Sequence, residues 1–63
     1  MDLNKAIAAV DESKSGKRVR FDWNDWSNAE ETLRKAGYES RADFAHSEAM
    51  RAYHKEEYDA DLL

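Results

Sequence analysis

The fold is decided by the stretch KRVRFDW, residues 17–23. Charged and apolar side chains alternate strictly along it, a period of two that is typical of a β-strand with one apolar face. Val19, Phe21 and Trp23 share the apolar face, so we expect them to lie in the core. The pattern predicts a strand over residues 17–22. No other stretch is a convincing strand, so the backbone N–H and C=O groups of this one need a partner from another chain.

Three helices are predicted around this strand from apolar residues spaced i, i+3, i+4. They cover residues 2–13, 24–36 and 41–57, and the acidic tail 58–63 is expected to fray. Gly16 ends the first helix and Gly37 the second. The expected fold class is therefore mainly α with one short β-strand, in the order helix-strand-helix-helix, within a single domain over residues 1–63.

Capping signals set the expected starts of the last two helices. Ser27 with Glu30 and Ser40 with Asp43 have the three-residue spacing of a capping box. Asn24 or Asp25 could cap an earlier start of the middle helix, and Trp26 is expected to pack inward from it. A helix that directly follows the strand would pack beneath the apolar face of residues 17–23.

The length of the chain makes its stability marginal. A chain of 63 residues buries only about 60% of its unfolded surface, and chains this short usually add disulfides, a metal or a second subunit. The sequence has no cysteine, which excludes disulfides. We therefore expect a homodimer in which two copies of strand 17–22 pair antiparallel over their helices. Alternatively, the helix over residues 2–13 covers the strand within one chain and prevents this pairing.

The charge of the chain is divided unevenly around a net value of −4. Residues 1–20 carry five basic and three acidic side chains, whereas residues 21–63 carry five basic and eleven acidic ones. A basic strand suits phosphate or an acidic partner, and an acidic end suits a basic surface. The two halves therefore indicate two different kinds of partner.

The order of elements resembles that of the ribbon-helix-helix DNA-binding family over residues 17–57. The resemblance rests on the alternating strand, the helix directly after it, the break at Gly37 and the Ser-rich start of the last helix at residues 40–44. It implies a repressor or antitoxin-like regulator of transcription that reads double-stranded DNA with a two-stranded ribbon in the major groove. The residues implied in DNA binding are Lys17, Arg18, Arg20, Asp22, Ser40 and Arg41.

These residues also have an alternative explanation. Arg18, Arg20 and Asp22 could instead form the solvated face of an amphipathic strand, with charges that discourage aggregation of its edge.

A second hypothesis uses the acidic side chains. In size, charge and lack of cysteine the chain is similar to small acidic phage inhibitors, including anti-CRISPR proteins, which mimic DNA and block a nucleic-acid-binding protein. The acidic surface would then comprise Glu30, Glu31, Asp43, Glu48, Glu56, Glu57, Asp59 and Asp61. A third hypothesis is a small interaction module without a role in nucleic-acid binding.

Other classes of function lack their sequence signals. The chain has no Ser/His/Asp or Cys/His set and no Gly-rich phosphate loop, so we expect neither an enzyme nor a small-molecule substrate. His46 and His54 lie eight residues apart without a convergent third ligand, and we expect no metal or cofactor. The longest apolar run, residues 6–10, is too short for a membrane span or a secretory signal, so the expected location is cytoplasmic.

Overall fold

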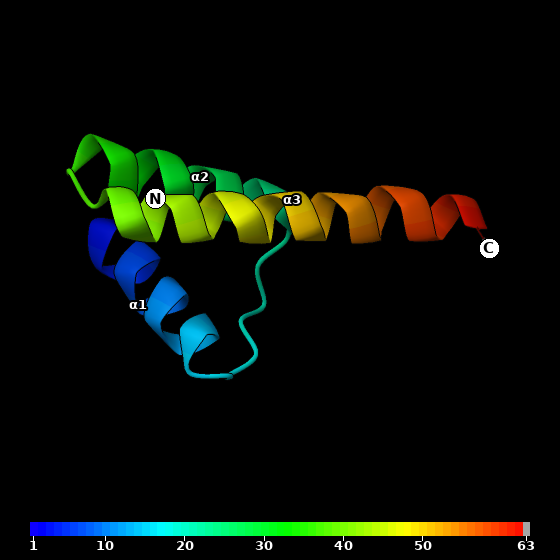
Figure 1. Ribbon diagram of the computed structural model, residues 1–63, viewed down its shortest axis with the longest axis horizontal. Helices are drawn as coiled ribbons and strands as arrows, with labels where there is room; N and C mark the ends of the chain where they lie inside the picture. The colour runs from blue at the N-terminus through cyan, green and yellow to red at the C-terminus, as the bar shows by residue number, and fades with distance from the viewer. Residues whose placement is uncertain (63) are drawn as a thin grey trace.

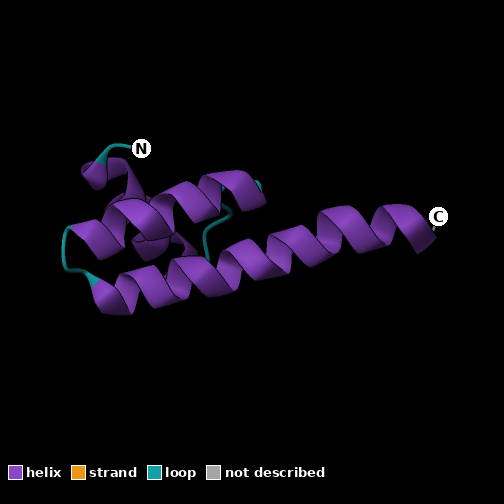
Figure 2. Ribbon diagram, turned by 90° about the horizontal axis from the view of Figure 1, so that it is seen from above, coloured by secondary structure: helices purple, strands orange, loops and turns teal. Residues whose placement is uncertain are grey.

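A computed structural model of the chain shows a small bundle of three helices (Figure 1). It describes residues 1–62, and the side chains of residues 1–55. The helices are α1 (Leu3–Lys14), α2 (Trp23–Lys35) and α3 (Glu39–Leu62). Over the described residues there is no β-strand (Figure 2). The predicted helix-strand-helix-helix order is therefore wrong, and the chain is all-helical.

Residues 17–22 form an irregular connection between α1 and α2. Val19 and Phe21 are half-buried against the core, whereas Arg18 and Arg20 are exposed. The alternation of burial is therefore present without a strand, because any connecting segment laid across a core with one face inward produces it. The expected membership of the ribbon-helix-helix family is therefore wrong, and so is the expected dimer paired through that strand. Both need a β-strand, which residues 1–62 do not contain.

The connection ends where local capping starts α2. The Asp22 carboxylate accepts a hydrogen bond from the Asp25 N–H at 2.8 Å, and the Asp25 carboxylate accepts one from the Asp22 N–H at 3.2 Å. This reciprocal capping box satisfies two backbone donors that the helix leaves free. Ser27 therefore lies inside α2 rather than at its start, and Asp22 is a cap rather than an outward strand residue.

Two glycines end α1 and α2 with the same geometry. Gly16 has a φ of +92° and Gly37 a φ of +87°, a region that favours glycine. At the end of α2, the Gly37 N–H donates to the Arg34 carbonyl and the Tyr38 N–H to the Leu33 carbonyl, which is a Schellman motif. The turn at residues 36–38 then reverses the chain, so that α2 and α3 form an antiparallel hairpin.

Helix α3 is longer than its neighbours. It has 24 residues against 13 in α2, and it begins at Glu39, so Ser40 lies within its first turn instead of capping it. It also continues through the tail that was expected to fray, to Leu62. Its C-terminal end projects past α2 and α1, and among residues 1–62 no other helix runs beside it (Figures 1 and 2).

The core is made mostly of small side chains. Its only large side chains that are fully buried are Leu33 and Val10, within the described part of the chain. Trp26 is 4% exposed and meets the rings of Phe21 and Phe44 edge-on, at 5.0 and 6.4 Å between centroids. The remaining six buried positions are alanines, at 6, 9, 29, 42, 45 and 49. Alanines let α2 and α3 approach closely, but they bury little apolar area.

Candidate protein-binding surface

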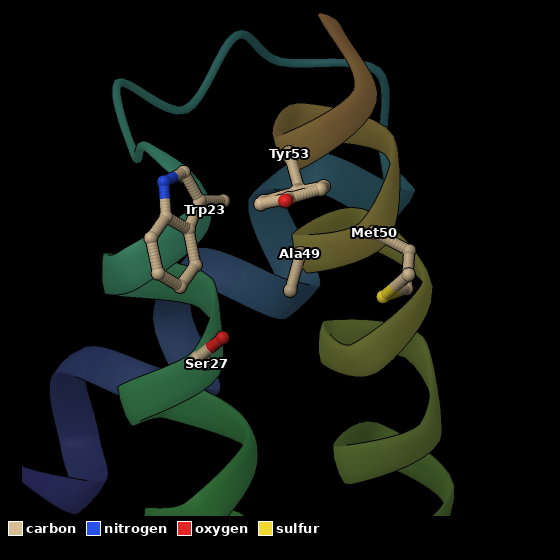
Figure 3. A pocket seen from close by; sticks show the side chains of 5 residues that line it. All are labelled: Trp23, Ser27, Ala49, Met50 and Tyr53. Carbon is tan, nitrogen blue, oxygen red and sulfur yellow. The ribbon is translucent and has the colours of Figure 1, made fainter. Parts of the chain in front are cut away.

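A hollow opens between α2 and α3 at the end of the hairpin where α2 begins. It has a volume of about 210 Å³ and is lined by Trp23 and Ser27 from α2 and by Ala49, Met50 and Tyr53 from α3 (Figure 3). Ala49 forms part of its wall because a small side chain is required where the two helices pack closely. The hollow therefore continues the alanine seam of the hairpin to the surface.

Large apolar side chains border this hollow while remaining in contact with solvent. Trp23 is 36% exposed, Met50 44% and Tyr53 38%. We call these three residues the open-end patch. The rings of Trp23 and Tyr53 meet edge-on, with centroids 5.6 Å apart and planes at 89°, so each restricts the other. Tryptophan, tyrosine and methionine are enriched in protein interfaces, and this arrangement is chemically suited to binding an apolar group.

The opposite end of the hairpin is held by a network of charges. Arg34 contacts the Glu30 carboxylate at 2.9 Å and the Asp43 carboxylate at 3.4 Å, which joins α2 to α3. The His46 Nδ1 lies 3.0 Å from the other Glu30 oxygen. We call Glu30, Arg34, Asp43 and His46 the closed-end network.

The closed-end network shifts two pKa values. Partial burial acts to raise the pKa of Glu30, but hydrogen bonds from Arg34 and His46 and their positive charge outweigh it and lower that pKa. The hydrogen bond to Glu30, opposed by desolvation and helped by Asp43, raises the pKa of Arg34. Nearby on α2, a hydrogen bond from Lys35 lowers the pKa of Glu31. These carboxylates are thus held ionised by partners within the chain.

The predicted acidic surface divides into two sets. Glu30, Glu31, Asp43 and Glu48 all have basic partners within the chain. Glu48 is the least accessible, with a side chain that is 15% exposed, contacts Arg51 at 3.6 Å and accepts a hydrogen bond from the Ser13 hydroxyl at 2.9 Å. The second set lies on the projecting end of α3, outside the residues whose side chains are described: Glu56, Glu57, Asp59 and Asp61.

The residues predicted to bind DNA are separated along the hairpin. Lys17, Arg18 and Arg20 are exposed in the connection that leads to the start of α2, and none of the ion pairs among the described residues involves them. Ser40 and Arg41 lie beyond the other end of α2, at the start of α3. Arg41 is engaged there, at 3.2 Å from Asp11 and above the Tyr38 ring at 5.7 Å.

The residues of the connection and those at the start of α3 therefore lie at opposite ends of α2. The ends of α2, with 13 residues at a rise of about 1.5 Å each, stand roughly 18 Å apart. A role for any of these six residues in binding stays a prediction.

The open-end patch was not predicted from the sequence. Strand alternation assigned Trp23 to the core, whereas Trp23 is the first residue of α2 and faces the surface hollow. A usable signal was present in α3, where Met50 and Tyr53 lie three residues apart beside the alanine stripe. Large residues next to such a stripe indicate that the apolar face of α3 is wider than the seam that α2 covers.

Comparison with known proteins found no relative of this chain. No protein-family model, curated protein or solved structure matches the chain. Among the described residues no three histidine or acidic side chains converge as a metal site. Helices in the same part of the chain lack the length and apolarity needed to cross a membrane. A function can therefore be proposed only from the sequence and from the geometry of the hairpin.

Proposed function

We propose that this protein is a small acidic inhibitor that binds a nucleic-acid-binding protein and blocks its basic surface. The observation that carries the proposal is the projecting end of α3 (Figure 1). The sequence places four acidic residues within six positions there, residues 56–61. A helix that stands clear of its own bundle can lie in a groove or on a flat surface of another protein.

The placement of these acids is unfavourable for the helix itself. The C-terminus of a helix carries partial negative charge, so carboxylates near it destabilise the helix and basic residues stabilise it. The last turn of α3 contains no basic residue. Helix stability therefore does not explain this composition, whereas recognition of a positively charged partner does.

Four of the acidic side chains on α2 and on the described part of α3 are already paired within the bundle. Glu30, Glu31, Asp43 and Glu48 already have basic partners on α2 or α3. A local cluster of one sign speeds the encounter with a surface of the opposite sign and repels nucleic acid. A basic groove that normally binds phosphates has the complementary charge.

The test is competition with duplex DNA. The immobilised chain is incubated with a cell extract at low salt, and the retained nucleic-acid-binding proteins are challenged with duplex DNA. We expect DNA to displace them, because both ligands occupy one basic surface. A variant with amides at all four acids of the α3 end, Glu56, Glu57, Asp59 and Asp61, should retain at least about tenfold less, the scale of losing several interfacial charges.

A control variant separates this effect from net charge. It carries the same number of acid-to-amide changes on exposed positions elsewhere: Asp11, Glu12, Glu31 and Glu39. This control should retain the same proteins as the unmodified chain. Equal loss in both variants, or salt-dependent binding of the chain itself to fluorescent duplex DNA, would contradict the proposal.

A further inference from the structure

We infer that residues 18–21, in the connection between α1 and α2, bind an extended acidic segment of another protein, which adds to them as a β-strand. The inference goes beyond the proposed function and does not depend on it, because the proposed inhibitor surface is the projecting end of α3. It also differs from a ribbon of two identical chains, since the bound segment carries the opposite charge to residues 18–21.

The first support is the backbone of this segment. The Lys17 N–H donates to the Glu12 carbonyl at 3.0 Å, and the Asp22 N–H donates to the Asp25 carboxylate at 3.2 Å. Between these two anchors, the N–H and C=O groups of residues 18–21 form no hydrogen bond with the described part of the chain. Donors and acceptors are therefore both available over four consecutive residues, as at the edge of a sheet.

The second support is the alternation of burial along the same residues. Val19 and Phe21 are half-buried against the core, whereas Arg18 and Arg20 are exposed. Successive side chains thus lie on opposite sides, as in a β-strand, and the segment lacks only a neighbouring strand. Figure 1 shows the connection on the outside of the bundle, held between the ends of α1 and α2. A segment fixed at both ends loses little conformational freedom on binding.

The third support is the charge of the exposed side chains, which selects the bound segment. Arg18 and Arg20 lie two residues apart, about 6–7 Å along an extended chain, and Lys17 is exposed beside them. None of the three forms an ion pair within residues 1–55. An added strand presents its own side chains at the same spacing, so carboxylates at alternate positions lie opposite the two arginines. A basic segment would be repelled there.

The free carbonyl groups favour a peptide over nucleic acid. Phosphate oxygens accept hydrogen bonds, so they satisfy arginines and backbone N–H groups but leave the carbonyls of residues 18–21 without a donor. A peptide strand supplies donors and acceptors together. The net charge of −4 also opposes a long polyanion more strongly than a short acidic peptide.

Three fluorescent probes test which ligand binds, at about 0.15 M salt, where charges more than about 8 Å apart are largely screened. One is an eight-residue peptide that alternates glutamate and threonine, and the second has four glutamates followed by four threonines. The third is a single-stranded oligonucleotide of thymidines. We expect the alternating peptide to bind about threefold more tightly than the block peptide, which has only half of its carboxylates on one face. The oligonucleotide should bind most weakly.

Matched variants test the position of the site. Arg18→Gln combined with Arg20→Gln should weaken binding of the alternating peptide by about threefold to tenfold, the scale of two exposed ion pairs. Lys5→Gln combined with Lys55→Gln is the control of equal charge change, at exposed lysines on α1 and α3. It should leave the affinity unchanged, with circular dichroism confirming that both variants are folded.

Amide hydrogen exchange tests the backbone pairing. With the alternating peptide at about ten times its dissociation constant, exchange should slow by about tenfold at every second amide of residues 18–21, because alternate N–H groups of a strand face its neighbour. Unchanged exchange at these residues would overturn the inference. So would no binding of the alternating peptide up to about 500 µM, equal affinity for the two peptides, tighter binding of the oligonucleotide, or equal weakening by the two double variants.

Discussion

The two ends of the α2–α3 hairpin differ in whether their side chains find partners within the chain. At the closed end, Arg34, Glu30, Asp43 and His46 satisfy one another across the two helices, and the turn at Gly37 completes the hydrogen bonds of α2. At the open end, Trp23, Met50 and Tyr53 surround a hollow, and the basic connection beside them is unpaired within the described chain. The charged groups of the closed end are paired within one chain, whereas the open end exposes apolar and basic side chains to solvent.

Charged residues of this chain fall into two groups, those paired within the fold and those without a partner among residues 1–55. Glu30 and Arg20 are both plausible binding residues from the sequence, but only Arg20 lacks a partner among residues 1–55. Composition does not reveal this difference, because pairing depends on which helix faces which. Substitutions within the closed-end network should therefore change stability, whereas substitutions within the open-end patch should change it little.

The largest expected effect is at Leu33, which is fully buried in the hairpin. Leu33→Ala should lower the free energy of unfolding by about 3 kcal/mol, since it removes transfer free energy and leaves a cavity. Met50→Ala at the open end should cost less than about 0.5 kcal/mol, because that side chain is already 44% exposed. Urea unfolding at low protein concentration, followed by circular dichroism, measures both. Similar losses of unfolding free energy in the two variants would contradict the difference between the two ends of the hairpin.

An intermediate effect is expected at Asp22, the cap of α2. Asp22→Ala should cost about 1 kcal/mol, because the Asp25 N–H loses its acceptor and the reciprocal bond loses its geometry. The control is Asn24→Ala, an exposed position within the first turn of the same helix. Thermal unfolding should show a lower midpoint only for the Asp22 variant. An unchanged midpoint would mean that Asp22 is not needed to start α2.

The smallest effect is expected at Glu30 and depends on pH. Glu30→Gln should cost about 0.5 kcal/mol at neutral pH, the scale of a partly exposed ion pair. Because the folded pKa of Glu30 lies below its usual value of 4.5, its contribution is complete above about that pH. It is lost as the pH falls through the lowered folded pKa.

The stability difference between the chain and Glu30→Gln should therefore shrink in acid. Urea unfolding at a series of pH values measures it, and Glu12→Gln, at an exposed glutamate near the end of α1, provides the control. A difference that grows as the pH falls would show that the closed-end network does not hold Glu30 ionised.

The helices were predictable because their signals are local. Apolar spacing indicated three helices close to where they lie, and Gly37 adopts the left-handed conformation that its position after α2 requires. The buried alanines at 42, 45 and 49 have the spacing of three and four residues from which that helix was predicted.

The absence of a strand over residues 17–22 could not be predicted in the same way. An alternation with a period of two occurs both in a paired strand and in a connection that crosses a core. Only backbone hydrogen bonds to a neighbouring strand distinguish the two. Alternation also placed Trp23 inward, but the Asp22–Asp25 capping box starts the helix one residue earlier and turns that side chain to the surface. Likewise, the approach of His46 to Glu30 joins positions sixteen apart in the sequence, which no local pattern reports.

The short turn between α2 and α3 also has a kinetic consequence. These two helices share most of the contacts between elements, and they are joined by only residues 36–38. Forming the hairpin therefore closes a short loop, with a low entropic barrier. Helical topologies dominated by such neighbouring contacts fold in about microseconds to milliseconds. The hairpin should therefore form quickly, so that a partner meets α2 and α3 already packed together.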